Sequence, residues 1–195
     1  MSETQQLLVI PTPADFSGIA RLESAAFAEK LVCDGKAESE RNCIKKYSTY
    51  YRDNPQKISR CRIIKSDNGR GDDVVAACQL QALDDPGDLG FPPGMRHTLK
   101  EGEVYVEWIA CHPDYVGKGL GSKLLKWADD YAKNELQAQV LSLQVMKGNK
   151  GAVRLYERKG YVAKPHETQG FLSSLFVFCC LGCRYWTVLY MEKEL

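Results

Sequence analysis

Three glycines at alternate positions, Gly117, Gly119 and Gly121, form the part of the sequence whose residue types and spacing best suit a chemical role. Without a side chain, the backbone at such positions can turn sharply and approach a ligand closely. The amphipathic stretch that follows predicts a helix, whose first N–H groups are unpaired and whose dipole is positive at this end. The cluster is therefore a candidate phosphate site, with the backbone amides from Gly117 to Ser122 as donors. The alternative is a tight structural turn with no ligand.

Two nucleotide-binding motifs fit this cluster poorly. The dinucleotide fingerprint needs a further glycine at the correct offset and a later acidic residue, and the phosphate loop of nucleotide hydrolases needs Lys-Ser or Lys-Thr after its last glycine. Here Ser122 comes before Lys123, which is the reverse order. Both nucleotide interpretations are disfavoured.

A strand expected at 103–111 leads into the glycine cluster, and a helix expected at 119–134 follows it. Successive strand residues point to opposite faces of a sheet. Alternation places Glu107 on one face together with Tyr105, Ile109 and Cys111, and places on the other face Val104, Val106, Trp108 and Ala110. A β-bulge within the strand would shift this register.

The remaining pattern predicts one α/β (α+β) domain over residues 1–195. Its expected elements are an extended segment at 7–11, helices from 13 to about 30 and at 36–52, a hairpin of strands 61–65 and 74–83, a strand at 140–146, a helix at 149–159 and a last strand at 184–192. The segment 84–100, rich in proline and glycine, is expected to be a loop and, as a hypothesis, a substrate-side insertion. The apolar run 171–181 fits buried structure best, with a wall of the acceptor pocket or a lipid-facing surface as alternatives.

Two stretches carry a resemblance to a known family. The residues WIACHPDYVGKGLG at 108–121 resemble motif A of the GNAT family of N-acetyltransferases, a strand followed by a pyrophosphate loop and a helix. The residues NKGAVRLYERKGY at 149–161 resemble the family's motif B. Two motifs in the right order and at an ordinary separation are more specific than either alone.

The resemblance implies a mixed, mostly antiparallel, twisted sheet that is flanked by helices and splayed at its fourth and fifth strands. It implies acetyl-coenzyme A as co-substrate and no metal. The cofactor's arm is then expected along the backbone of Ile109, Ala110 and Cys111, and its pyrophosphate at Gly117, Lys118, Gly119, Leu120, Gly121 and Ser122.

In the second stretch, Asn149, Ala152 and Tyr156 share one helical face and are also candidate cofactor contacts. The alternative is an ordinary amphipathic helix with Ala152, Leu155 and Tyr156 in the core. One position departs from the family pattern. Val116 stands where the family has Arg or Gln, so Lys118 is the candidate source of the missing charge.

The expected reaction needs a group that removes a proton from the amine, because a free alkylamine has a pKa near ~10.4. Glu107 is the first candidate, since the family often uses a carboxylate or histidine of this strand; the alternative is a Glu paired with a neighbouring cation at the rim. Tyr105 is a second contributor. Tyr156 matches the family tyrosine expected to donate a proton to the departing thiolate. Cys111 beside a thioester suggests covalent catalysis, but a buried strand cysteine is usually a small apolar residue.

Composition bounds the function further. The 195 residues include 26 Lys and Arg against 25 Asp and Glu, so no global field attracts nucleic acid or an anionic membrane. The polar N-terminus does not read as a secretory signal, and the eight cysteines fit reduced thiols in a cytoplasmic protein. No apolar run reaches the roughly 20 residues of a membrane span. His97 and His112 have no companion ligands at metal spacing.

The acceptor is expected to be an amine on a small molecule or a peptide, but no motif identifies it, and the oligomeric state, monomer or homodimer, stays open. A coenzyme A-binding regulator without turnover is the alternative, which Val116 favours. An interaction module with a purely structural glycine loop is a further alternative.

Overall fold

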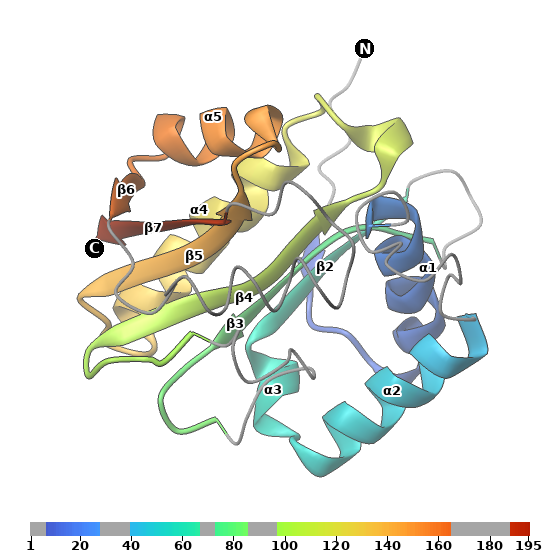
Figure 1. Ribbon diagram of the computed structural model, residues 1–195. Coiled ribbons are helices and arrows are strands. Elements are labelled where there is room, and N and C mark those ends of the chain that lie inside the picture. The colour runs from blue at the N-terminus through green and yellow to red at the C-terminus, as the bar shows by residue number, and fades with distance from the viewer. Residues whose placement is uncertain (1–6, 28–39, 67–72, 86–96, 165–187) are drawn as a thin grey trace, which may run out of the picture.

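A computed structural model describes residues 7–27, 40–66, 73–85, 97–164 and 188–195. Its strands form one seven-stranded sheet in the order β1-β2-β3-β4-β5-β7-β6 (Figure 1). β4 and β5 run parallel, and all other neighbours are antiparallel. The strands are β1 (Leu8–Val9), β2 (Cys61–Lys65), β3 (Val74–Gln81), β4 (Glu103–Cys111), β5 (Val140–Met146), β6 (Val162–Lys164) and β7 (Val188–Glu194).

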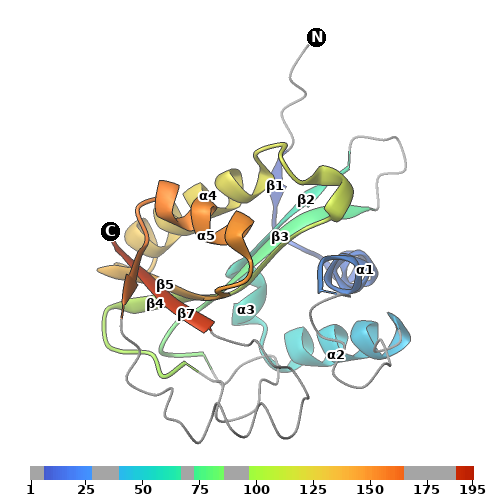
Figure 2. The same cartoon turned by 45° about the horizontal axis from the view of Figure 1, so that its top comes forward.

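Helices cover both faces of the sheet (Figure 2). One face carries α1 (Phe16–Phe27), α2 (Glu40–Asp53) and the single turn α3 (Gln56–Ser59), and the other carries α4 (Leu120–Asn134) and α5 (Lys150–Arg158). Each face encloses its own apolar core: Ile19, Leu22, Tyr47 and Tyr51 belong to the first, and Leu124, Leu125, Leu141 and Leu143 to the second. The mixed sheet with helices on both faces agrees with the expected fold class.

β4 and β5 pair over only part of their lengths. Their pairing begins at Glu103 with Val140 and ends at Val106 with Leu143, although β4 continues to Cys111 and β5 to Met146. The ends of the two strands are thus unpaired with one another, and the predicted splay at the fourth and fifth strands is confirmed.

A β-bulge lies where this splay begins. Gln79 of β3 is opposite Trp108, but the next residue, Leu80, is opposite Val106, so Glu107 is the extra residue on β4. A bulge reverses the facing of every residue beyond it. The prediction that Glu107 shares a face with Ile109 and Cys111 is therefore wrong.

The two cores show the effect of the bulge directly. Val104 and Val106, before the bulge, pack on the α4 side together with Ile109 and Cys111 beyond it. Trp108 and Ala110 pack on the α1 side. Glu107 also points to that side, where it contacts residues of α2 and α3.

Element boundaries otherwise follow the predictions closely. β2, β4, β5 and the first residue of β3 match, and α4 begins one residue later than expected. The pattern did not predict α3 or the edge strand β6, whose three residues are all exposed and therefore carry no alternation. The described part of the last strand lies at 188–194. The structural predictions for residues 28–30, 36–39, 86–96 and 171–181 lie outside the described residues.

Candidate active site

The corner between β4 and α4 contains the glycine cluster. A short 3-10 helix, η3 (Pro113–Tyr115), follows β4, and His112 accepts a hydrogen bond from the amide of Asp114 at its start. Gly117 and Gly119 then adopt φ values of 85° and 81°. Residues other than glycine are strained in this left-handed region, so the corner needs glycine at both positions.

The space beside these two glycines is open. A Cβ built on Gly117 or Gly119 would meet no atom within 4 Å. The first backbone hydrogen bond of α4 runs from the amide of Lys123 to the carbonyl of Gly119 at 3.0 Å. The amides of Leu120, Gly121 and Ser122 precede that bond, as the first N–H groups of any helix do.

Gly121 is glycine for a different reason. Its φ is not positive, but an added Cβ would lie 3.0 Å from Leu155 Cδ2 of α5 and 3.9 Å from Cys111 Sγ. The absent side chain therefore lets α4, α5 and the end of β4 meet. Leu120 turns its side chain into the core, so only its backbone faces the corner.

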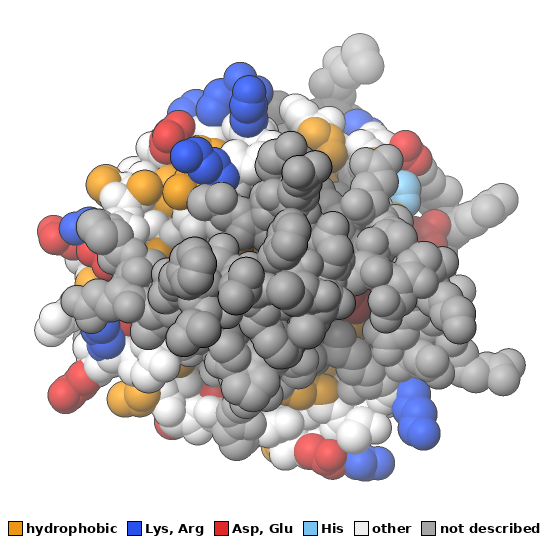
Figure 3. Space-filling model, viewed as in Figure 1, with side chains coloured by type: hydrophobic (Ala, Val, Ile, Leu, Met, Phe, Trp, Pro, Cys, Tyr) orange, Lys and Arg blue, Asp and Glu red, His pale blue; other side chains and the backbone are white. Residues whose placement is uncertain are grey.

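Lys118 is the cation of this corner. Its Nζ lies 4.1 Å from the ring centroid of Tyr115, whose hydroxyl is 2.9 Å from Ser66 Oγ. Val116, at the position where the family has Arg or Gln, is 70% exposed. Lys150, Arg154 and Arg158 add positive charge on α5, above which Lys and Arg side chains gather in the space-filling view (Figure 3).

Cys111 sits between the corner and the core. Burial raises the pKa of its thiol to about 11, even though the Gly121 amide hydrogen-bonds to the sulfur and acts in the other direction. A thiol with this pKa is protonated at neutral pH. The interpretation of Cys111 as a small buried residue is favoured over a covalent nucleophile.

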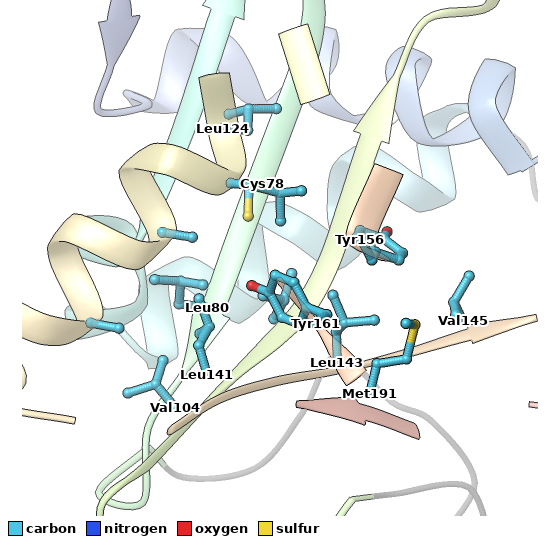
Figure 4. Close-up of a cluster of buried hydrophobic side chains, with 14 of the residues drawn as sticks. Cys78, Leu80, Val104, Leu124, Leu141, Leu143, Val145, Tyr156, Tyr161 and Met191 are labelled. Carbon is cyan, nitrogen blue, oxygen red and sulfur yellow. The ribbon is translucent and has the colours of Figure 1, made fainter. Parts of the chain in front are cut away.

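Tyr156 lies in the core beneath the corner, only 6% exposed. Figure 4 places it in the same buried cluster as Cys78, Tyr161 and Leu143. Burial raises its pKa, and the nearby thiols of Cys78 and Cys111 act in the same direction. A phenol that keeps its proton meets the requirement for a proton donor.

The other two candidates on α5 have structural contacts. Asn149 caps the helix, because its Oδ1 accepts the amide hydrogen of Ala152 at 3.3 Å. Ala152 packs against the core with Val153 and Leu155. The structure thus brings Tyr156 close to Cys111, while Asn149 acts as a helix cap.

Glu107 occupies the bulge and is not a free carboxylate. Its side chain is 1% exposed, and its Oε2 lies 2.9 Å from Nζ of Lys57, which is 0% exposed. Tyr50 of α2 donates a weaker hydrogen bond to the same oxygen at 3.4 Å. The pairing with a neighbouring cation is confirmed, but the pair is buried and not at the rim.

Tyr105 lies on β4 between Glu103 and Glu107. Burial raises its pKa, and the electrostatic contributions that follow come from Glu107, Tyr156, Glu103 and Tyr190, in that order. These neighbours belong to β4, α5 and β7. Tyr105 thus lies two residues before Glu107 on β4, with its ring 5.1 Å from the ring of His97.

A second polar cluster was not predicted. His97 Nε2 is 2.6 Å from Glu103 Oε1, which also accepts hydrogen bonds from Ser142 and from the Tyr190 hydroxyl at 3.0 Å. The His97 ring lies between the rings of Tyr105 and Tyr190, at 5.1 and 5.0 Å. These residues come from four segments, so no sequence spacing could have grouped them.

Within this cluster, the Glu103 carboxyl group has a pKa well below its usual value. Burial alone would raise its pKa, but hydrogen bonds from His97, Ser142 and the Lys100 amide outweigh burial and lower the pKa to about 2. The carboxylate is thus ionised at neutral pH. No group of three potential metal ligands occurs among the residues that the structure describes. Within the same ranges, no helix has the length and apolarity of a membrane span.

The mixed sheet with its splayed strand pair and open glycine corner defines the fold class, and comparison with known proteins gives the family. The chain matches the acetyltransferase (GNAT) family over residues 26–161 and belongs to it. The matched range includes both motifs, at 108–121 and 149–161.

Characterised relatives resemble only part of the chain. It is 33% identical over 86 residues, 44% of this chain and 45% of the relative, to S-(2-succino)cysteine N-acetyltransferase of Bacillus subtilis. It is 31% identical over 72 residues, 37% of this chain and 47% of the relative, to a Bacillus subtilis subsp. natto protein named "Probable spermine N(1)-acetyltransferase". The chain spans less than half the length of these curated relatives.

Among solved structures, the PaiA N-acetyltransferase of Thermoplasma acidophilum in complex with coenzyme A shares 13% identity with a TM-score of 0.61. The match covers 97% of this chain and 98% of that one. At this identity the likeness concerns the fold alone.

Proposed function

We propose that this chain is an N-acetyltransferase that transfers an acetyl group from acetyl-coenzyme A to a primary amine by direct attack in a ternary complex. The observation that carries the proposal is the open glycine corner directly beside a parallel strand pair that separates after Val106 and Leu143. Family membership and the two relatives named as N-acetyltransferases support it.

The described residues fit coenzyme A. Gly117 and Gly119 leave open space at the corner, and the amides of Leu120 and Ser122 precede the first helical hydrogen bond, which suits a pyrophosphate; the Gly121 amide bonds to the Cys111 sulfur. Lys118 supplies a nearby positive charge. Ile109, Ala110 and Cys111 pair with β3 on one side, and their other side borders the splay without a partner in β5, which suits the amide groups of the pantetheine arm.

Tyr156 and Glu107 divide the proton transfers. The amine nitrogen forms a bond to the acetyl carbon, the carbon–sulfur bond breaks, and Tyr156 gives its proton to the departing sulfur. Glu107 takes the proton that the amine loses, directly or through water, and Tyr105, two residues earlier on β4, is the alternative contributor. The known relatives suggest a small amine, such as a polyamine or an amino acid, as the acceptor.

Two measurements test the proposal in sequence. Titration calorimetry with acetyl-coenzyme A should show saturable binding, and a panel of primary amines that includes spermidine and S-substituted cysteines should give thiol release. No heat at millimolar acetyl-coenzyme A would exclude any coenzyme A-dependent role. Binding without thiol release from any amine would instead favour a non-catalytic coenzyme A-binding regulator, to which the exposed Val116 points.

A further inference from the structure

We propose that Lys57 is a positioning residue that keeps Glu107 ionised and fixed at the β4 bulge, an inference that rests on the proposed acetyl transfer. Lys57 is one residue of a single helical turn, α3, and its side chain is 0% exposed. Its Nζ lies 2.9 Å from Glu107 Oε2 and 3.5 Å from Asp85 Oδ2. The lysine therefore joins two buried carboxylates.

The need for the lysine follows from the burial of Glu107. A carboxylate removed from water and left alone takes up a proton, and a protonated Glu cannot accept another from an amine. A cation in direct contact favours the ionised form. Lys57 meets this need because it is buried with Glu107 and cannot exchange its contact for water.

The backbone of α3 is held at the same point of the sheet as the bulge. Gln79, the β3 residue opposite Trp108, donates hydrogen bonds from Nε2 to the carbonyls of Lys57 at 3.0 Å and Arg60 at 3.2 Å. Its Oε1 accepts the Tyr51 hydroxyl at 2.8 Å. One buried glutamine thus fixes the position of Lys57 relative to Glu107.

Asp85 is the partner that competes for Lys57. It is held in place by Arg60 and by the amide of Ala82, which donates to its Oδ2 at 2.8 Å. Arg60 in turn pairs with Asp84 at 3.0 Å, near the surface. The charges form one connected chain, so a change at Asp85 alters the field at Glu107 without touching it.

Besides Lys57 and Asp85, the structure shows phenols and a thiol near Glu107. Tyr50 comes from α2, and Tyr105 lies on β4 itself, where burial raises its pKa. Cys61 on β2 has a pKa raised to about 12, mainly by burial and in small part by Glu107. Lys57 is therefore the group whose charge directly opposes that of Glu107.

The test is the pH profile of kcat/KM, measured with the best amine of the panel. Activity falls as the pH decreases through the range in which Glu107 takes up a proton. In Lys57→Met the loss of the cation should move this acidic limb to higher pH by about one unit or more. In Asp85→Asn the loss of a competing anion should move it to lower pH. The amine's own ionisation is common to all variants and cancels.

Two further variants keep the test decisive. Lys57→Met leaves a buried carboxylate unpaired and can lose its fold, so Lys57→Arg is measured too; it keeps the charge and should leave the limb within a few tenths of a unit while lowering kcat. Lys193→Met is the matched control. Lys193 Nζ pairs with Asp129 Oδ2 of α4 at 2.7 Å, on the other face of the sheet, so its loss should reduce stability and leave the profile unmoved.

The outcomes separate the two proposals. An active enzyme whose acidic limb stays in place in every folded variant of Lys57 and Asp85 overturns the role of Lys57 alone. A shift in Lys193→Met equal to that of Lys57→Met also overturns it, because the effect would then be structural. A wild-type protein that releases no thiol with any amine overturns the proposed function and this inference with it.

Discussion

Two tyrosines buried in the same core, Tyr156 and Tyr161, differ in the groups that surround their hydroxyls. The rings of Tyr156 and Tyr161 lie 5.9 Å apart in the core beside α4 and α5. The Tyr161 hydroxyl has no hydrogen-bond partner among the residues that the structure describes. The Tyr156 phenol lies near the thiol of Cys111, at the end of the strand that borders the splay. In the proposed reaction, the tyrosine at position 161 serves packing and the tyrosine at position 156 serves proton donation.

This contrast gives a matched pair of substitutions. Tyr156→Phe should lower kcat roughly tenfold with little change in acetyl-coenzyme A affinity, because only the proton donor is lost and a thiolate is a stable leaving group. Tyr161→Phe removes an equally buried hydroxyl of the same cluster and should keep kcat. The measurements are saturation kinetics and calorimetry. Equal rates in wild type and Tyr156→Phe would contradict the role of Tyr156.

Glu103 makes a prediction about stability and pH. Its pKa is lowered in the folded protein to about 2, so the folded state favours the ionised form and gains stability above the unfolded pKa near 4.5. This contribution, on the order of 3 kcal/mol, is lost as the pH falls from about 4.5 towards 2.

Urea unfolding of wild type and Glu103→Gln at several pH values checks this prediction. The difference in unfolding free energy between the two proteins should be largest near pH 7 and should shrink as the pH falls from about 4.5 towards 2. Ser142→Ala removes one donor to the same carboxylate and should show a smaller gap with the same pH dependence. A gap that does not change with pH would contradict the assignment.

At the scale of elements, the corner between β4 and α4 combines conformational strain with open space. Gly119 and Gly160 share a left-handed backbone, with φ of 81° and 89°. Gly119 precedes α4 at the open corner, whereas Gly160 follows α5, where a Cβ would meet the Lys193 side chain at 3.7 Å. Their conformational demands are alike, but only one borders the proposed phosphate site.

Gly119→Ala and Gly160→Ala should therefore each destabilise the protein by about 1 kcal/mol, since an L-residue is strained at positive φ. Only Gly119→Ala should also weaken acetyl-coenzyme A binding, by roughly tenfold, because the added methyl group would enter the open space that we propose holds the pyrophosphate. Thermal melts and calorimetry separate the two effects. An equal loss of affinity in both variants would mean that the corner holds no ligand.

For the whole molecule, the sheet separates two chemical environments. The face with α4 and α5 carries the corner, Cys111 and Tyr156, and the face with α1, α2 and α3 carries Glu107 with its buried cation. The pairing of β4 and β5 ends after Val106 and Leu143. We propose that a cofactor on one face and an amine on the other meet at this splay.

Binding across this splay should stabilise the entire fold. Acetyl-coenzyme A at 100 times its dissociation constant should add about 2.7 kcal/mol, and at this chain length that corresponds to a rise in Tm of roughly 5–10 °C. Adenosine diphosphate at the same concentration reaches only the corner and should raise Tm less. Scanning calorimetry checks both ligands, and an unchanged Tm would contradict a cofactor site in this fold.

The elements around the corner could be predicted from sequence patterns alone. The spacing of Gly117 and Gly119 predicted a sharp backbone turn before a helix, because residues without a side chain can adopt such a turn. The strands and the amphipathic helices were predictable for a similar reason, since burial on one face leaves a period in the sequence. The two motifs then identified the family.

Which residues contact one another depended on how the strands and helices pack together. The bulge at Glu107 adds one residue to β4 opposite Gln79, and no local pattern records an insertion that depends on a partner strand. For the same reason Lys57 and Asp85, separated in sequence from Glu107, became its electrostatic surroundings only through folding. Periodicity reports burial along a single element, whereas a carboxylate's charge depends on contacts between elements.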